Sequence, residues 1–140
     1  MGEMMDDSVI QLVKQSYGRA LADKSLMKRF YENFVSSHPA VAVKFAGVDL
    51  ERQQDVLKMS LSMAIVFPQN NIVAKRAMDK VQLSHGGDGL GIEAELYTHW
   101  LESLVSTIEE CDPAFTPELE RNWRAVLGCA IQHISCPAMA

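Results

Sequence analysis

The chain has 140 residues, 48% of them apolar, which is enough for one domain with a buried core. Its formal net charge of −5, with no cluster of Lys and Arg longer than KR, argues against a nucleic-acid-binding surface. The longest apolar run, MAIVF, is far shorter than the roughly 20 residues that cross a bilayer. The polar start MGEMMDDS does not resemble a secretory leader, and three cysteines without CxxC spacing favour reduced thiols. We therefore expect a single cytoplasmic domain, residues 1–140, that binds neither nucleic acid nor a membrane.

Helical spacing dominates the first third of the chain. A first helix is expected to start near Asp6, where acidic and hydroxyl side chains suit an N-cap, and its apolar residues recur at three- and four-residue steps. Ser25 is expected to cap a second helix, SLMKRFYENFVSS. Pro39 predicts the start of a short third helix, and Gly47 predicts the corner that closes it.

The remaining two thirds of the chain show the same helical spacing of apolar residues. Asp49 opens a long helix that PQNN breaks, and a weaker helix runs from about Ile72 to His85. Two further helices are expected in IEAELYTHWLESLVSTIEE and after Thr116–Pro117. No segment alternates with period two for long enough to predict a strand. The pattern therefore indicates an all-α chain with six or seven helices.

His85 differs from the other histidines because four glycines follow it within six residues. Glycines let a helix stop abruptly and the chain reverse. A helix-end imidazole is the standard proximal ligand of haem iron in oxygen-binding helical proteins, but a capped helix end with a surface histidine has the same local pattern. His38 before Pro39 suggests capping or solvent contact, and His99 and His133 suggest surface or interfacial positions.

Longer segments carry a resemblance that covers almost the full length. These are FYENFVSSHPAVAVKFAG, QQDVLKMSLSMAI, LSHGGDGLGI followed by ELYTHWLESL, and RNWRAVLGCAI. In them the chain resembles the globin family, particularly the bacterial single-domain haemoglobins and the haem domain of flavohaemoglobins. The resemblance implies a globin fold, a three-on-three helical sandwich of six to eight helices around a pocket for haem b.

Three residues match the family's contacts with the haem itself. The resemblance implies that His85 is the proximal iron ligand and that Phe45 packs flat against the porphyrin. It also implies that Tyr97 packs below the haem on the proximal side.

Three more residues match the opposite, distal side, where a gas ligand binds. Tyr31 matches a tyrosine whose hydroxyl points at the ligand, Gln53 matches a distal glutamine, and Leu57 matches an apolar wall residue. A hydroxyl or amide donor favours O2 over CO, and a charge-assisted hydrogen bond is worth about 1.5–3 kcal/mol. The ERQQD pattern leaves open whether Gln53 or Gln54 faces the ligand.

The resemblance implies reversible binding of O2, and also of CO and NO. The function is then oxygen storage and transport, or dioxygenation of NO with electrons from an external reductase. A glutamate that flavohaemoglobin-like proteins carry near the last helix's end is missing from ISCPAMA, so the resemblance does not extend to their oxygen-activating chemistry. The alternatives are a gas sensor that acts through a protein partner and, less favoured, a haem-free interaction module. The sequence does not favour a monomer over a homodimer.

Overall fold

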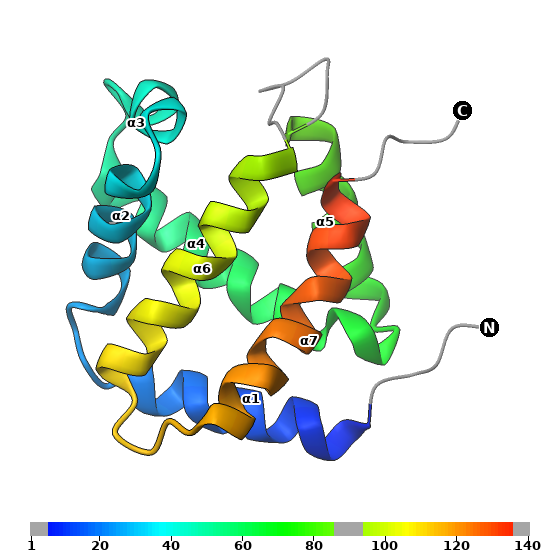
Figure 1. The fold of residues 1–140 in the computed structure, drawn as a ribbon. Helices are drawn as coiled ribbons and strands as arrows, with labels where there is room; N and C mark the ends of the chain where they lie inside the picture. Colours follow the sequence, from blue (N-terminus) through cyan, green and yellow to red (C-terminus); the bar gives the residue numbers. More distant parts are fainter. Residues whose placement is uncertain (1–5, 86–93, 136–140) are drawn as a thin grey trace.

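A computed structural model describes residues 6–85 and 94–135, without the side chains of Ser84, His85 and Ala94. Within these residues the chain is helical and contains no strand (Figure 1). The elements are α1 (Asp7–Leu21), α2 (Leu26–Ser37), α3 (Pro39–Phe45), α4 (Leu50–Val66), the 3-10 turn η1 (Phe67–Gln69), α5 (Ile72–His85), α6 (Ala94–Cys111) and α7 (Pro117–Ser135). None of the described helices is both long and apolar enough to span a membrane. The all-α prediction is confirmed.

Local chemistry sets most of the predicted helix boundaries. The Asp6 carboxylate accepts the Ser8 N–H at 2.9 Å at the start of α1. The Asp49 carboxylate caps α4 by accepting backbone N–H groups of its first turn at 3.1 and 3.3 Å. Pro39 occupies the first position of α3, and Gly47 adopts a φ of 79° in the corner that follows. These boundaries lie where the sequence predicts them.

The predicted cap at Ser25 is wrong. Ser25 stands at the N-cap position of α2 but makes no side-chain cap. Its φ and ψ of −89° and 1° lie outside the extended region that a capping residue usually adopts. The hydroxyl instead donates to the Asp23 carboxylate at 2.6 Å, so it belongs to the preceding turn.

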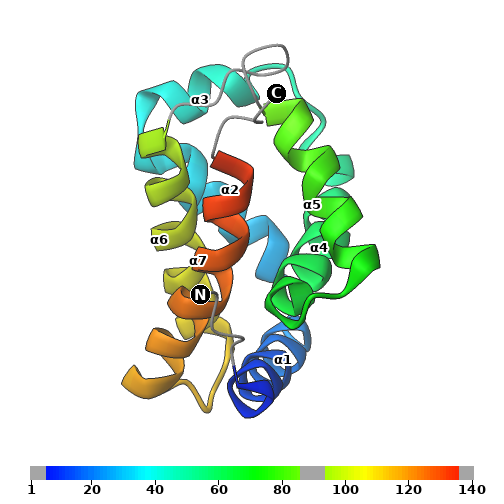
Figure 2. The same cartoon turned by 90° about the vertical axis from the view of Figure 1, so that its right-hand side faces the viewer.

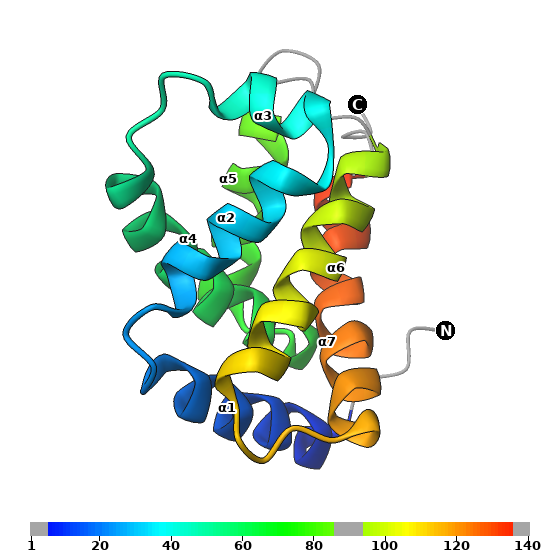
Figure 3. The ribbon, with the colours of Figure 1, turned by 60° about the vertical axis from the view of Figure 1, so that its left-hand side comes forward.

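The helices form two sets that meet mainly through α7. α2 packs along α6, α6 packs along α7, and α1 lies across the end of the α6–α7 pair (Figures 1 and 2). α4 and α5 form the second set, in which α5 also packs along α7 and α4 crosses α2 (Figure 3). Over the described residues α5 does not pack along α2, α3 or α6. The short helix α3 lies at the opposite end of the molecule from α1 (Figure 1).

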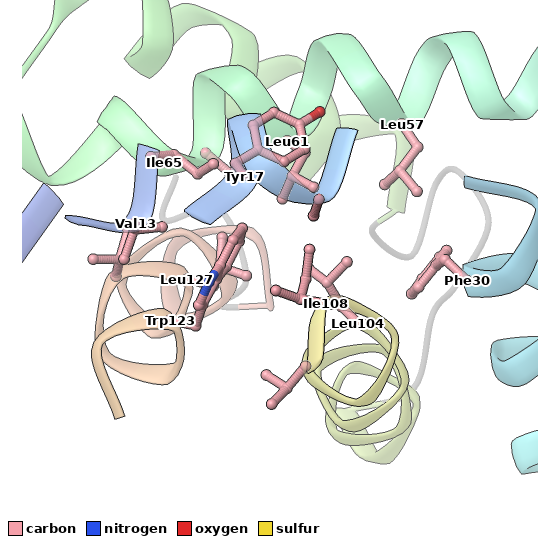
Figure 4. Close-up of a cluster of buried hydrophobic side chains, with 14 of the residues drawn as sticks. Val13, Tyr17, Phe30, Leu57, Leu61, Ile65, Leu104, Ile108, Trp123 and Leu127 are labelled. Carbon is pink, nitrogen blue, oxygen red and sulfur yellow. The ribbon is translucent and has the colours of Figure 1, made fainter. Parts of the chain in front are cut away.

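The core lies where the two sets converge (Figure 4). Trp123 of α7 is completely buried, and Phe30 of α2 is buried to the same extent. Further core side chains come from α1, α4, α6 and α7, among them Val13, Leu61, Leu104, Ile108 and Leu127. Burial of these large apolar side chains is the main favourable term in folding.

A buried polar cluster joins α1 to the turn between α6 and α7. The Asp112 carboxylate accepts hydrogen bonds from the Ser16 hydroxyl at 2.6 Å and from the Ala114 N–H at 2.9 Å. Arg19 donates to both carboxylate oxygens, at 2.6 and 3.0 Å. The indole N–H of Trp123 donates to the Ser16 oxygen at 3.0 Å. The cluster thus has a partner for every charge and fixes the position of α1.

Candidate functional site

Aromatic side chains from α2 and α3 meet at the end of the molecule where α3 lies. Tyr31 is 6% exposed, and its ring centroid lies 5.6 Å from that of Phe45 in an edge-to-face arrangement. Phe34 contacts Phe45 in a similar geometry, at 5.8 Å. Phe45 is the last residue of α3 and is only partly buried, so this cluster extends from the core toward the surface.

The Tyr31 hydroxyl bridges α2 and α4. It donates a hydrogen bond to the backbone carbonyl of Gln53, with 3.2 Å between the two oxygens. Burial raises the pKa of Tyr31 to about 12. The phenol therefore keeps its proton at neutral pH and remains a hydrogen-bond donor.

The two neighbouring glutamines of α4 have different surroundings. Gln54 lines an open hollow of about 840 Å³ between α2 and α4, together with Tyr31 and with side chains such as Lys28 and Glu32. Gln53 does not line this hollow, because it lies about 100° away around the helix. Within the described residues the partly buried side-chain amide of Gln53 makes no hydrogen bond. The Gln54 amide makes no hydrogen bond within the described residues either, so both glutamines carry an unpaired amide.

One turn after Gln53, Leu57 is 6% exposed and belongs to the core. Val56, beside it, is 50% exposed. Gln53, Val56 and Leu57 share one face of α4 because residues three and four apart are neighbours on a helix. This face carries one amide among apolar side chains.

The remaining predicted site residues lie on α5 and α6. His85 is the last residue of α5, but its side chain lies outside the described residues. Tyr97 lies near the start of α6 and is partly buried, and burial raises the pKa of its phenol. The structure thus brings Tyr31, Phe45 and Gln53 together, with Leu57 one turn away, whereas no contact of His85 is described.

The sequence does not predict two histidine–carboxylate contacts that the structure contains. His38 caps α3 as expected, since its Nδ1 accepts the Ala40 N–H at 3.0 Å. Its Nε2 also lies 3.0 Å from the Glu95 carboxylate. His133 of α7 lies 2.6 Å from the Asp79 carboxylate of α5. Each pair joins residues far apart in the chain, so the sequence contains no local signal for either contact.

Comparison with known proteins identifies the fold. No protein-family model and no curated protein matches the chain. It is similar to a crystal structure of a Pseudomonas aeruginosa protein that is described as structurally highly homologous to a human haemoglobin. The two chains are 30% identical and superpose with a TM-score of 0.85, over 90% of this chain and 95% of the other. The predicted globin fold is therefore confirmed, and the protein belongs to the globin-like proteins.

Proposed function

We propose that the protein is a haem-binding globin that binds O2 reversibly, and also CO and NO. The observation that carries the proposal is the contact between Tyr31 and α4 beside Phe45, in a chain with a globin-like fold. A protonated phenol and an unpartnered amide there form a polar edge on an otherwise apolar site. This donor set suits a small polarised ligand such as O2.

The residues present fit haem b. When bound, haem would supply an iron that binds a diatomic gas, with a histidine imidazole as its protein ligand. Phe45 and Leu57 would contact the porphyrin, Tyr97 would pack on the proximal side, and His85 would be the iron ligand. The packing of α5 supports this arrangement, because α5 lies along α4 and α7 but not along α2 or α6 in the described part.

Tyr31 would stabilise the ligand by changing its hydrogen-bond acceptor. Its single proton is now donated to the Gln53 carbonyl, a neutral hydrogen bond of 3.2 Å. Such a bond contributes about 1 kcal/mol, whereas a bond to a charged or strongly polarised acceptor contributes about 1.5–3 kcal/mol. The hydroxyl would therefore turn toward a polarised ligand. The Gln53 amide would supply a second donor.

Dioxygenation of NO is the enzymatic extension of the same proposal. Nitrate contains the atoms of one NO and one O2, and one electron balances its charge. A separate reductase would supply that electron. Tyr31 and Gln53 would hold O2 in place during this reaction.

The experiment that tests the proposal is a ligand-binding spectrum of the purified ferrous protein with O2 and CO. We expect a Soret band that shifts reversibly with each gas. His85→Ala should lose haem or require added imidazole to restore the spectrum, because the iron loses its protein ligand. His133→Ala is the matched control, because His133 is a partly buried histidine that contacts Asp79, and it should retain haem. A chain that takes up no haem, or a His85→Ala spectrum identical to that of the wild type, would contradict the proposal.

A further inference from the structure

A cluster of three metal-ligating side chains shares no residue with the candidate haem site. His38 Nε2 and Glu95 Oε1 are 3.0 Å apart, and the ring centroids of His38 and His99 are 5.0 Å apart. One ligand atom from each of the three residues lies within 4.8 Å of the other two. Among the described side chains, this is the group of three that is close enough to share one ion. We propose that His38, Glu95 and His99 bind a divalent transition-metal ion.

Two helices hold the three side chains. Glu95 and His99 are four residues apart on α6, so both project from one face of that helix. The same i, i+4 spacing delivers two ligands to one ion in helical zinc motifs. His38 lies between α2 and α3, and α2 packs along α6, which brings its ring to the same face. The cluster is therefore fixed by helix packing rather than by a loop.

The donor set selects the metal. Two imidazole nitrogens and one carboxylate oxygen suit Zn²⁺, Cu²⁺ or Ni²⁺, whereas Mg²⁺ and Ca²⁺ prefer oxygen ligands. A tetrahedral Zn²⁺ ion with bonds of about 2.1 Å places its ligand atoms about 3.4 Å apart. The present separations of up to 4.8 Å require only a small side-chain movement. The Glu95 side chain is 60% exposed and is free to make that movement.

Binding would compete with the cap of α3. The His38 Nδ1 accepts the Ala40 N–H, so the neutral ring carries its proton on Nε2, next to Glu95. A metal ion at Nε2 displaces that proton to Nδ1, where an N–H can no longer accept from Ala40. Metal binding therefore breaks one cap hydrogen bond. The loss of this bond lowers the affinity of the site for the metal ion by about fivefold. This coupling distinguishes the proposed site from an ordinary histidine–carboxylate pair.

The test is a titration of the full-length protein with Zn²⁺, followed by calorimetry, with Mg²⁺ titrated in parallel. We expect Zn²⁺ to bind and Mg²⁺ not to bind detectably. His99→Gln should weaken Zn²⁺ binding about tenfold or more, because it removes one of three ligands. His133→Gln is the matched control, since that histidine contacts a carboxylate without a third ligand, and it should bind Zn²⁺ like the wild type.

A second variant separates the metal ligand from the cap. Asn is among the strongest N-cap residues but lacks the imidazole, so His38→Asn should lose Zn²⁺ binding and keep the melting temperature of the wild type. The proposal is overturned if the wild type binds no Zn²⁺. It is also overturned if both His99→Gln and His38→Asn bind with unchanged affinity, or if His133→Gln abolishes binding.

Discussion

The two ends of the molecule differ in how completely their side chains are packed and partnered. At the end where α1 crosses α6 and α7, Trp123 is completely buried and Asp112 accepts four hydrogen bonds. At the end where α3 lies, Phe45 is partly buried, and the Gln53 amide has no partner among the described residues. The first end stabilises the fold, and the second leaves side chains available to a ligand. Sites are commonly drawn from such less stable regions.

The largest expected difference between the ends comes from removing one aromatic side chain from each. Trp123→Ala should lower the free energy of unfolding by about 3–5 kcal/mol, because it opens a cavity in the core. Phe45→Ala should cost less than half as much in the haem-free protein, because that ring is already partly exposed. Urea unfolding of both variants measures the difference. Equal losses would show that the two ends are packed equally well.

The buried polar cluster should be the next most sensitive feature. Asp112→Asn removes charge-assisted hydrogen bonds with Arg19, and we expect a loss of about 2–3 kcal/mol in urea unfolding. Glu102→Gln is the matched control, because Glu102 also pairs with an arginine at 2.6 Å but its side chain is 56% exposed. That exposed pair should contribute about 0–1 kcal/mol. If Glu102→Gln lowers the free energy of unfolding as much as Asp112→Asn, burial does not make the Asp112 pair more stabilising.

The same carboxylate predicts how stability depends on pH. Burial of Asp112 raises its pKa, but hydrogen bonds from Arg19, Ser16 and the Ala114 N–H outweigh burial, so the pKa lies below its ordinary value of 3.8. Its contribution is therefore complete above pH 3.8 and is lost as the pH falls from there through the lower native pKa. Unfolding measured across this range should show a shallower pH dependence for Asp112→Asn than for the wild type. If the stability of the two proteins changes with pH to the same extent, Asp112 does not cause this pH dependence.

A smaller effect on stability than that of Asp112→Asn is expected at the candidate site. Tyr31→Phe removes one hydrogen bond to the Gln53 carbonyl and should cost about 1 kcal/mol in urea unfolding. If the proposed function holds, O2 should also dissociate about tenfold faster, because a donor to the ligand is lost. Flash photolysis or stopped-flow mixing measures that rate.

Two glutamine variants identify the second donor. Gln53→Leu should also speed O2 release, whereas Gln54→Leu should not, because the Tyr31 hydroxyl contacts α4 at Gln53. If Tyr31→Phe leaves the rate of O2 release unchanged, the hydrogen-bond donor to O2 is Gln53 or water. If Gln54→Leu speeds O2 release and Gln53→Leu does not, the second donor is Gln54.

The sequence predicted most helix boundaries because short-range chemistry sets them. Asp6, Asp49 and Pro39 act on backbone groups within their own first turn, and that interaction depends on neighbouring residues alone. Ser25 shows the limit of this reasoning, because its backbone angles turn the hydroxyl toward Asp23 instead of the helix. A residue type predicts a cap only where the backbone also adopts the capping conformation.

The candidate site was predictable in part. The resemblance to globins named Tyr31, Phe45 and Gln53, and the structure brings these residues together. It did not indicate that the Tyr31 hydroxyl already donates to a backbone carbonyl, or that Gln54 and Tyr31 line one hollow that Gln53 does not line. Both facts depend on how α2 crosses α4. The role of His85 stays a prediction.

The residue pattern alone indicates that the chain folds into helices, roughly where each helix begins, and which face of each helix is apolar. These properties follow from a 3.6-residue period and from side chains that act on the nearest backbone groups. The contact of Ser16 with Asp112, 96 residues away, and the cluster of His38 with Glu95 and His99 arise from how the helices pack. Hydrogen bonds reach about 3 Å and metal–ligand bonds about 2 Å, and helical periodicity does not specify which distant side chains packing brings within that reach.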